Sequence, residues 1–317
     1  MNRPNESLRA EVARVLREAG ADIVRFGNAA RFRDPAVRRL MPEAETVIAA
    51  AFRQLRGSRR GIEEGSTYYQ YTTMAVETLE EVVMPLALHQ ACGVLERAGF
   101  DALPQRRSQL VMAEADGTNP EVDHREIYRR CAAECQLDFE QCAVDAGLGE
   151  RGLSGSILTD EFGPFLRWVL ILTDAAFAAD PVVEPHLCDR CGACVRACPG
   201  HALSPEGTRD DWQCAVYYQG GNRTRNPFMP PDAFPEEPDR LAVMAGEAHL
   251  SPERARQILE QIHFYPPMKH AYCASICGKA CDTACYIHLE EKGVLTRKFA
   301  APFRRRPAWK LSLEGEK

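Results

Sequence analysis

The sequence predicts an α/β domain followed by a smaller, cysteine-rich module of helices and loops. Helical and strand patterns alternate before residue 180, as is typical of an α/β domain. Nine of the 13 cysteines lie between residues 188 and 285. We therefore expect an α/β domain over residues 1–180, a cysteine-rich domain over residues 181–296 and a basic tail over residues 297–317.

The first elements follow from the spacing of apolar residues. Apolar side chains at helical spacing predict a helix over residues 7–20, with Gly20 placed to end it. A short strand is expected over residues 21–26. The continuous apolar run over residues 47–52 suits a buried strand. The arginine- and glycine-rich stretch 53–66 predicts a solvated loop.

A long helix is expected next, capped by Thr72 or Thr73, with Pro85 favouring a kink. The later patterns predict a strand over 103–112, a helix over 124–146 that carries Cys131, Cys135 and Cys142, a buried strand over 166–173, and a helix from Ser251 to about His263.

The strongest motif runs from Cys188 to Pro199 and has the form C-x2-C-x2-C-x3-C-P. Three cysteines at this spacing can cover three corners of an iron–sulfur cube, and the fourth ligates the other cluster in two-cluster ferredoxins. A zinc knuckle is the alternative, but zinc sites favour separated cysteine pairs. The motif therefore predicts a [4Fe–4S] cluster.

A second cysteine group has one cysteine every four residues, a spacing that would place its thiols along one helix face. Two clusters need eight thiolates, so nine cysteines leave one over. The ferredoxin crossing rule joins Cys188, Cys191 and Cys194 to Cys285. It joins Cys198 to three of the four remaining cysteines: Cys214, Cys273, Cys277 and Cys281. Buried free thiols on a helix are the alternative for the second group.

Composition restricts the remaining classes of function. The net charge of −6 gives no indication of a nucleic-acid partner. The first lysine is Lys269, so no lysine precedes it as an acid or base. No signal peptide is evident, and no run approaches the roughly 20 apolar residues that span a membrane. We expect a cytoplasmic protein in a reducing, low-oxygen setting.

A glycine-rich loop follows the 124–146 helix and formally contains G-x-G-x-x-G. The dinucleotide fingerprint requires a strand before these glycines, and here a helical pattern precedes them, so a nicotinamide site is not favoured. A backbone free of side chains still allows close approach to a flat or phosphate-bearing ligand. The candidate ligand-binding residues are Gly147, Gly149, Gly152 and Gly155.

These motifs together resemble one superfamily. The glycine-rich loop, Leu158-Thr-Asp-Glu-Phe-Gly163, the strand 169–174 and the cysteine motif are similar to the cobalamin-dependent epoxyqueuosine reductases and reductive dehalogenases. The segment beginning Pro42-Glu-Ala-Glu-Thr resembles the family's early strand. Asp211-Trp-Gln-Cys214 resembles its isolated cysteine, which implies that Cys214 is a ligand and Cys273 is the cysteine left over.

The resemblance implies a nitroreductase-like α/β domain that holds a corrinoid, followed by a ferredoxin-like module with two [4Fe–4S] clusters. Electrons from a low-potential donor, a ferredoxin or flavodoxin, would then pass through the clusters to cobalt. The expected reaction is reductive removal of a halide, or of an epoxide or hydroxyl oxygen, from a small organic substrate. The alternative is a two-cluster ferredoxin-type electron-transfer protein without a corrinoid.

The sequence departs from the family at several positions. Its last cysteine group is C-x3-C-x3-C-x3-C, where the family usually has C-x2-C-x3-C-P. The position of the catalytic aspartate of the epoxyqueuosine reductases is Ala133 here, and the nearest acids are Glu134 and Asp138. The tyrosine donor of the dehalogenases, which stands beside a basic residue, could be imitated by Tyr68, Tyr69 or Tyr71 with Arg151. The candidate catalytic residues are Tyr71, Asp138 and Arg151.

Overall fold

The structure is a computed structural model and describes residues 6–62, 66–106, 136–226, 228–264 and 275–304. The chain divides into two compact units. Unit 1 comprises Met1–Arg53, Glu80–Glu150 and Leu166–Pro185; unit 2 comprises Gln54–Leu79, Arg151–Phe165 and His186–Lys317. The expected boundary at residues 180–181 lies near Pro185, and two earlier segments also join unit 2.

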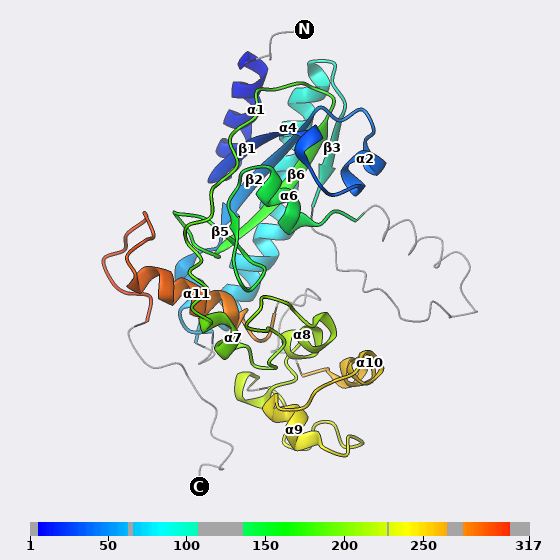
Figure 1. The fold of residues 1–317 in the computed structure, drawn as a ribbon, viewed down its shortest axis with the longest axis vertical. Helices are drawn as coiled ribbons and strands as arrows, with labels where there is room; N and C mark the ends of the chain where they lie inside the picture. The colour runs from blue at the N-terminus through cyan, green and yellow to red at the C-terminus, as the bar shows by residue number, and fades with distance from the viewer. Residues whose placement is uncertain (1–5, 63–65, 107–135, 227, 265–274, 305–317) are drawn as a thin grey trace, which may run out of the picture. The chain divides into compact units, whose positions relative to one another are not determined.

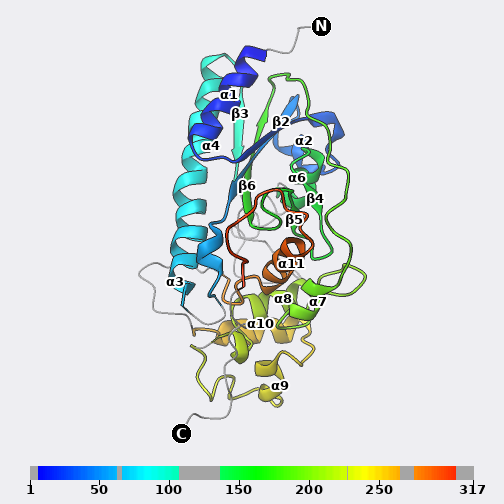
Figure 2. The same cartoon turned by 90° about the vertical axis from the view of Figure 1, so that its left-hand side faces the viewer.

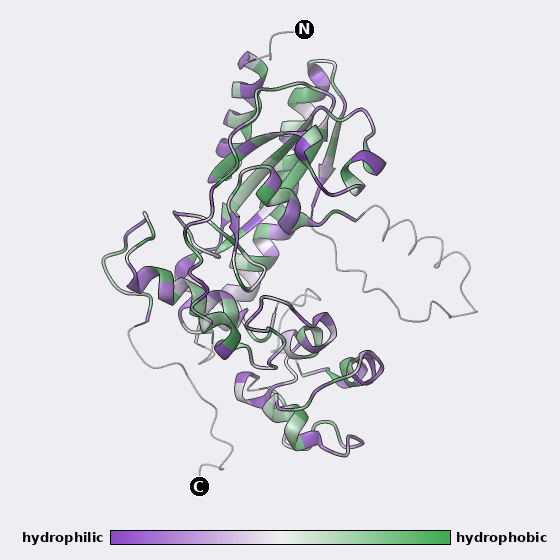
Figure 3. Ribbon diagram, viewed as in Figure 1, coloured by the Kyte–Doolittle hydropathy of each residue, from purple (hydrophilic) through white to green (hydrophobic). Residues whose placement is uncertain are grey.

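Unit 1 is built on a four-stranded antiparallel sheet (Figure 1). The strand order is β1 (Ile23–Asn28), β2 (Thr46–Arg53), β6 (Leu166–Thr173) and β3 (Ala102–Gln105). The two central strands are buried along nearly their whole length, which explains their continuous apolar sequences. Figure 3 shows these strands as largely hydrophobic. The strands predicted over 47–52 and 166–173 are confirmed.

Helices cover this sheet. The long helices α1 (Glu6–Glu18) and α4 (Met84–Arg97) pack against each other on one face (Figure 2). The short helices are η1 (Ala29–Arg31), α2 (Ala36–Leu40) and α6 (Phe139–Asp145). The buried side chains of α1 confirm the first predicted helix. Of the helix predicted over 124–146, residues 124–135, with Cys131 and Cys135, lie outside the described residues.

The helical stretch before α4 differs from the prediction. It begins at Tyr68 with α3 (Tyr68–Gln70) and continues as two π-helical segments, η3 (Tyr71–Glu77) and η4 (Leu79–Val83). Thr72 and Thr73 do not cap it, because their hydroxyls donate to the Tyr69 carbonyl within the helical stretch. Pro85 lies at the start of α4, directly after η4, so the change from π-helical to α-helical structure falls at this proline.

Unit 2 consists of short helices joined by long loops. Besides α3 and η3, its elements are η2 (Arg56–Arg59), β5 (Ile157–Leu158), α7 (Ala193–Ala197), α8 (Asp211–Tyr218), η5 (Arg223–Arg225), α9 (Arg240–Ala245), α10 (Pro252–Gln261) and α11 (Ala280–Glu291). β5 pairs with β4 (Glu150–Arg151). The Ser251 side chain accepts from the Arg254 N–H and caps α10, so the predicted helix from Ser251 is confirmed. Side chains of α8, α9 and α10 form an apolar core.

The first part of the basic tail packs onto unit 2. The ring of Phe303 is buried beside Tyr286 and Phe165, which stack with centroids 4.2 Å apart. Arg56 pairs with Glu290 at 2.5 Å and donates to the Ala301 carbonyl at 3.0 Å. The tail up to residue 304 therefore acts as a strap, while residues 305–317 lie outside the described part. Among the described residues, no helix is both long and apolar enough to span a membrane.

Candidate functional site

Four cysteines of unit 2 line a single pocket. Cys188, Cys191 and Cys194 approach it from the loop before α7 and from α7 itself, and Cys285 approaches from α11. The pocket has Leu153, Leu187 and Leu289 in its wall. We name these four cysteines the first thiol set. Cys194 is buried and Cys191 is exposed, so one edge of the set reaches solvent.

A backbone amide already points at a sulfur of this set. The Leu153 N–H donates to Cys188 Sγ at 3.3 Å. Hydrogen bonds of this kind tune the potential of iron–sulfur clusters. Gly192, with φ +72°, provides the left-handed residue that turns the loop into α7.

The remaining described cysteines of the module form a second thiol set: Cys198 just after α7, Cys214 on α8, Cys277 before α11 and Cys281 on α11. Burial, together with the neighbouring thiols of Cys277 and Cys198, raises the pKa of the Cys214 thiol to about 12. Burial, followed by Asp282 and the neighbouring thiols Cys277 and Cys214, raises the pKa of Cys281 well above its ordinary value. The four thiols are thus close enough to influence one another.

The two thiol sets fit a metal cluster chemically. Buried thiols without a nearby positive charge stay protonated and unreactive. A bound metal supplies that positive charge, and sulfur donors suit iron–sulfur clusters or zinc. Cys198 leaves the motif of the first set to join the second, and Cys285 joins the first from the distant helix.

Cys277 does not lie on a cysteine-bearing helix, which corrects the prediction for residues 273–285. α11 begins at Ala280, because Gly278 and Lys279 have φ +59° and +47° and cannot continue a right-handed helix. A Cβ on Gly278 would lie 2.5 Å from Ile62 Cγ2, so close packing also requires glycine here. Cys273 lies outside the described residues.

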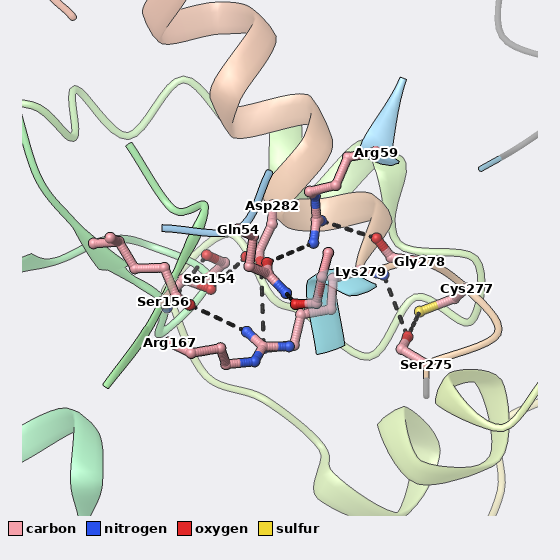
Figure 4. Close-up of polar contacts among 12 residues, drawn as sticks. Gln54, Arg59, Ser154, Ser156, Arg167, Ser275, Cys277, Gly278, Lys279 and Asp282 are labelled. Atoms are coloured by element: carbon pink, nitrogen blue, oxygen red, sulfur yellow. Dashed lines mark hydrogen bonds and ion pairs between the residues drawn. The ribbon is translucent and has the colours of Figure 1, made fainter. Parts of the chain in front are cut away.

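A buried arginine holds the turn that carries Cys277 (Figure 4). Arg59 is fully buried and donates to Gln54 Oε1 at 2.8 Å and to the Gly278 carbonyl at 3.0 Å. The loop predicted over 53–66 is therefore not simply solvated: Gln54 and Arg59 are both in the core. Nothing in the sequence indicates that these two side chains are buried, because arginine in a glycine-rich stretch is usually exposed.

Further polar contacts fix the start of α11 (Figure 4). Ser275 Oγ lies 3.1 Å from Cys277 Sγ and accepts from the Lys279 N–H at 3.3 Å. Asp282 is buried beside Cys281, and its Oδ1 accepts from Ser156 Oγ at 2.5 Å. The side chains of Ser275 and Asp282 both have hydrogen-bond partners, which favours a single conformation of the second thiol set.

Two glycines of the glycine-rich loop have contrasting surroundings. Gly147 has φ +78° and ends α6 with a Schellman pair of hydrogen bonds, from its own N–H to the Val144 carbonyl and from the Leu148 N–H to the Ala143 carbonyl, both at 2.9 Å. A Cβ at Gly147 would lie 2.2 Å from the Pro181 carbonyl oxygen. The chain's own backbone therefore fills the space beside Gly147.

Gly155 faces open space. It has φ +81° in the turn between β4 and β5, and a Cβ built there meets no atom within 4 Å. The same turn is closed by a hydrogen bond from the Gly152 N–H to the Ser156 carbonyl at 2.9 Å. Gly149 is buried. A Cβ at Gly152 would lie 3.0 Å from Leu158 Cδ1, so among Gly147, Gly152 and Gly155 it is Gly155 that has open space beside its backbone.

The three candidate catalytic side chains have different environments. Asp138, in unit 1, is exposed and caps α6 by accepting from the Gln141 N–H at 2.9 Å. Tyr71, in unit 2, is fully buried, and the cation over its ring is Arg59, 5.3 Å from the centroid. Arg151 is exposed on β4.

Comparisons with known proteins agree with this description of the site. Residues 181–204 match the family described as "4Fe-4S binding domain". A tetrachloroethene reductive dehalogenase of Sulfurospirillum multivorans is 33% identical over 82 residues, which are 25% of this chain and 16% of that protein. An epoxyqueuosine reductase of Synechococcus sp. (strain CC9605) is 32% identical over 96 residues, 30% of each chain.

The fold also has solved counterparts. A structure of a catabolic reductive dehalogenase matches with a TM-score of 0.51 and 14% identity, over 82% of this chain and 36% of that chain. In the sequence comparisons, the matched segments span less than a third of the length of the two relatives named above. Over these segments the chain is thus similar in sequence to epoxyqueuosine reductases and reductive dehalogenases, it carries a match to a 4Fe-4S binding domain, and it shares the fold of a reductive dehalogenase.

Proposed function

We propose that this protein binds two [4Fe–4S] clusters and a corrinoid and catalyses the reductive removal of a leaving group from an organic substrate. The observation that carries the proposal is the separation of eight cysteines into two sets of four. The first thiol set would ligate one cluster and the second thiol set the other. Cys198 and Cys285 cross between the two sequence motifs, as in two-cluster ferredoxins.

The match to a 4Fe-4S binding domain supports the first cluster. The second cluster rests on the proximity of Cys198, Cys214, Cys277 and Cys281, because partly buried thiols that lie this close together ionise more readily when a metal supplies positive charge. Cys273 is then the cysteine that ligates no iron.

The corrinoid rests on the relatives and on one local observation. A solved dehalogenase to which this chain is similar in fold is described as suggesting a mechanism for B12-dependent dehalogenation. The open backbone at Gly155 suits close approach of a flat ligand, whereas Gly147 does not, because Pro181 occupies that space. When bound, a corrinoid supplies a cobalt centre that is a strong reductant and nucleophile.

The chain's own residues would bind the substrate and move a proton. Replacing a halide by hydrogen consumes two electrons and one proton and releases the halide ion. Removing an epoxide oxygen as water consumes two electrons and two protons and leaves an alkene. Asp138 and Arg151 are exposed and can meet a substrate, whereas the buried Tyr71 is better placed to position its neighbours.

The names of the relatives suggest the substrates to test, a chlorinated alkene such as tetrachloroethene and epoxyqueuosine. Loss of chloride would favour a dehalogenase, and formation of the alkene would favour an epoxide reductase. An electron-transfer protein without a corrinoid would convert neither substrate.

The cluster assignment is tested by iron analysis of anaerobically reconstituted protein. Two cubes predict about eight irons per chain. Cys285→Ala should lose one cluster and Cys281→Ala the other, each leaving about four irons with a distinct electron paramagnetic resonance signal. Cys273→Ala is the matched control and should keep all the iron. Four irons together with bound zinc in the parent protein would contradict the second cluster.

A further inference from the structure

A buried carboxylate lies on α11 between cysteines of the two thiol sets. The side chain is that of Asp282, which is 1% exposed. Asp282 directly follows Cys281 of the second thiol set and comes three residues before Cys285 of the first. Residues i and i+3 of a helix are neighbours on its surface, with Cβ atoms about 5–6 Å apart. The carboxylate therefore lies close to one cysteine of each set.

Two contacts hold this carboxylate in place (Figure 4). Asp282 Oδ1 accepts from Ser156 Oγ at 2.5 Å, and Oδ2 lies 3.9 Å from Lys279 Nζ. Ser156 belongs to the turn between β4 and β5, and Lys279 immediately precedes α11. A buried charge needs partners of this kind, and an oxygen that accepts from a hydroxyl beside another that faces an ammonium suits the ionised form. Asp282 thus provides a fixed negative charge.

The thiols on either side of Asp282 respond to this charge. Burial raises the pKa of Cys281 and of Cys285, and in both cases the Asp282 carboxylate is the next largest cause. The direction follows because a negative charge nearby disfavours a second negative charge on sulfur. Lys279 acts on Cys281 in the opposite direction. By the same electrostatic relation, the carboxylate disfavours an electron added at either thiol set.

A second carboxylate, next to Cys188 of the first thiol set, is differently placed. The side chain of Asp189 is 41% exposed and forms ion pairs with Lys292 at 2.9 Å and His288 at 3.0 Å. Solvent and these two partners offset its charge. The buried Asp282 faces one ammonium, at 3.9 Å. Of the two carboxylates, Asp282 therefore acts on its neighbouring thiols with less screening.

We infer that the Asp282 carboxylate lowers the reduction potentials of the clusters proposed at both thiol sets. This inference rests on the proposed function, because it requires a cluster at each set. Reduction takes one electron from the donor and adds one negative charge to a cluster, with no bond made or broken. The net charge and the surroundings of a cluster set its potential, and a buried negative charge makes this addition less favourable. A cluster of lower potential is the stronger reductant, which suits reduction of a cobalt centre.

The experiment is a redox titration of the reconstituted, iron-loaded protein, in which electron paramagnetic resonance measures the reduced clusters at each applied potential. Asp282→Asn keeps the size of the side chain and removes its charge. The ratio of reduced to oxidised cluster at a fixed potential should rise at least about tenfold, which is a shift of about 59 mV for a one-electron couple. Iron content should stay at about eight per chain.

Lys279→Met removes the opposing positive charge and should shift the potentials the other way. The ratio of reduced to oxidised cluster should fall, by less than about tenfold, because the ammonium is 25% exposed and partly screened. Loosened packing would not reverse its effect with the sign of the charge removed, whereas an electrostatic role must. Lys279→Met also decides the question if Asp282→Asn loses its iron.

Glu291→Gln is the matched control. It removes the same charge as Asp282→Asn from the same helix, but Glu291 is exposed and lies at the end of α11 that is farther from Cys281 and Cys285. The ratio of reduced to oxidised cluster should stay within about twofold of the parent, because solvent screens an exposed charge.

Several results would overturn the inference while the proposed function stands. They are a ratio in Asp282→Asn within about twofold of the parent, an equal rise in Glu291→Gln, or shifts of the same sign in Asp282→Asn and Lys279→Met. Where Asp282→Asn loses its iron, an unchanged or raised ratio in Lys279→Met overturns it. A parent protein that holds no cluster reducible by dithionite would instead overturn the proposed function, and the inference with it.

Discussion

Replacement of Arg59 by methionine tests how the second thiol set is held. The guanidinium is fully buried and donates to Gln54 Oε1 at 2.8 Å and to the Gly278 carbonyl at 3.0 Å. It also lies over the rings of Tyr71 and Phe165, at 5.3 and 4.3 Å from the centroids. Arg59→Met leaves two buried acceptors without these donors and removes both ring contacts.

The size of the effect follows from these contacts. Each buried acceptor without a donor costs about 1–3 kcal/mol, and each ring contact contributes about 0.5–2 kcal/mol. Methionine offsets part of this loss, because it removes a charge that is costly to bury. We expect unit 2 to lose about 2–4 kcal/mol of unfolding free energy. For a domain of this size, that corresponds to a fall of roughly 4–16 °C in the unfolding midpoint.

The assay is thermal unfolding of the reconstituted protein, followed by circular dichroism, together with the rate of iron release to a chelator. Iron should leave faster from the cluster proposed at the second thiol set than from the one proposed at the first, because Gly278 adjoins Cys277 in the turn that Arg59 holds. The double variant Gln54→Leu, Arg59→Met should lose less than the sum of the single variants, since leucine no longer presents an unsatisfied acceptor.

Two outcomes would refute this reasoning. One is an unfolding midpoint of Arg59→Met within about 2 °C of the parent, less than 1 kcal/mol for a domain of this size. The other is equal acceleration of iron release from both clusters, which would show that Arg59 stabilises unit 2 generally and does not hold the Cys277 turn.

Three further predictions concern single residues. Gly147→Ala should destabilise unit 1 more than Gly155→Ala destabilises unit 2. Both glycines have positive φ, but of the two only Gly147 would place its added Cβ against a carbonyl oxygen, at 2.2 Å. Equal shifts of the thermal unfolding midpoint in the two variants would contradict this. Tyr217 donates to a buried carbonyl at 3.1 Å, and burial raises its pKa from 10.0 to about 12. Between these pH values the folded state therefore keeps a proton that the unfolded state loses, so the free energy of unfolding should fall as the pH rises. Urea unfolding at each pH should show a steeper fall in the parent than in Tyr217→Phe. Asp138→Ala should lose about 1 kcal/mol of helix capping, whereas Asp138→Asn should keep it. Turnover of Asp138→Asn measured on tetrachloroethene or epoxyqueuosine would then separate the two roles: loss of turnover with unchanged stability supports proton transfer, and full turnover excludes it.

Several features could be predicted from sequence because they depend on local patterns. The spacing of Leu8, Val12 and Leu16 places them on one face of α1, and all three are buried as the pattern predicts. The central strands were recognisable because both faces of each are covered, which makes their sequences apolar throughout. The cluster motif was also recognisable from the sequence, because the three cysteines of its C-x2-C-x2-C run are close together in the chain.

Other features depend on contacts between distant residues. The burial of Arg59 requires the Gly278 carbonyl, 219 residues away, and no property of the 53–66 stretch indicates it. The start of α11 is set by Lys279 in a left-handed conformation that only tertiary packing supports. Likewise, the Schellman end of α6 and the backbone of Pro181 account for Gly147, a glycine that the sequence motif associates with a ligand.

The most direct test of the proposed function is an anaerobic titration of the iron-loaded protein with cobalamin, followed by absorption spectroscopy. We predict that one cobalamin binds per chain, with the spectral shift that accompanies departure of its lower base from cobalt, and that reducing the clusters then reduces the bound cobalt. Gly155→Val should retain its iron but bind cobalamin more weakly. Absence of cobalamin binding by the parent protein under strictly reducing, anaerobic conditions would contradict the reductase function and leave electron transfer as the role of the two clusters.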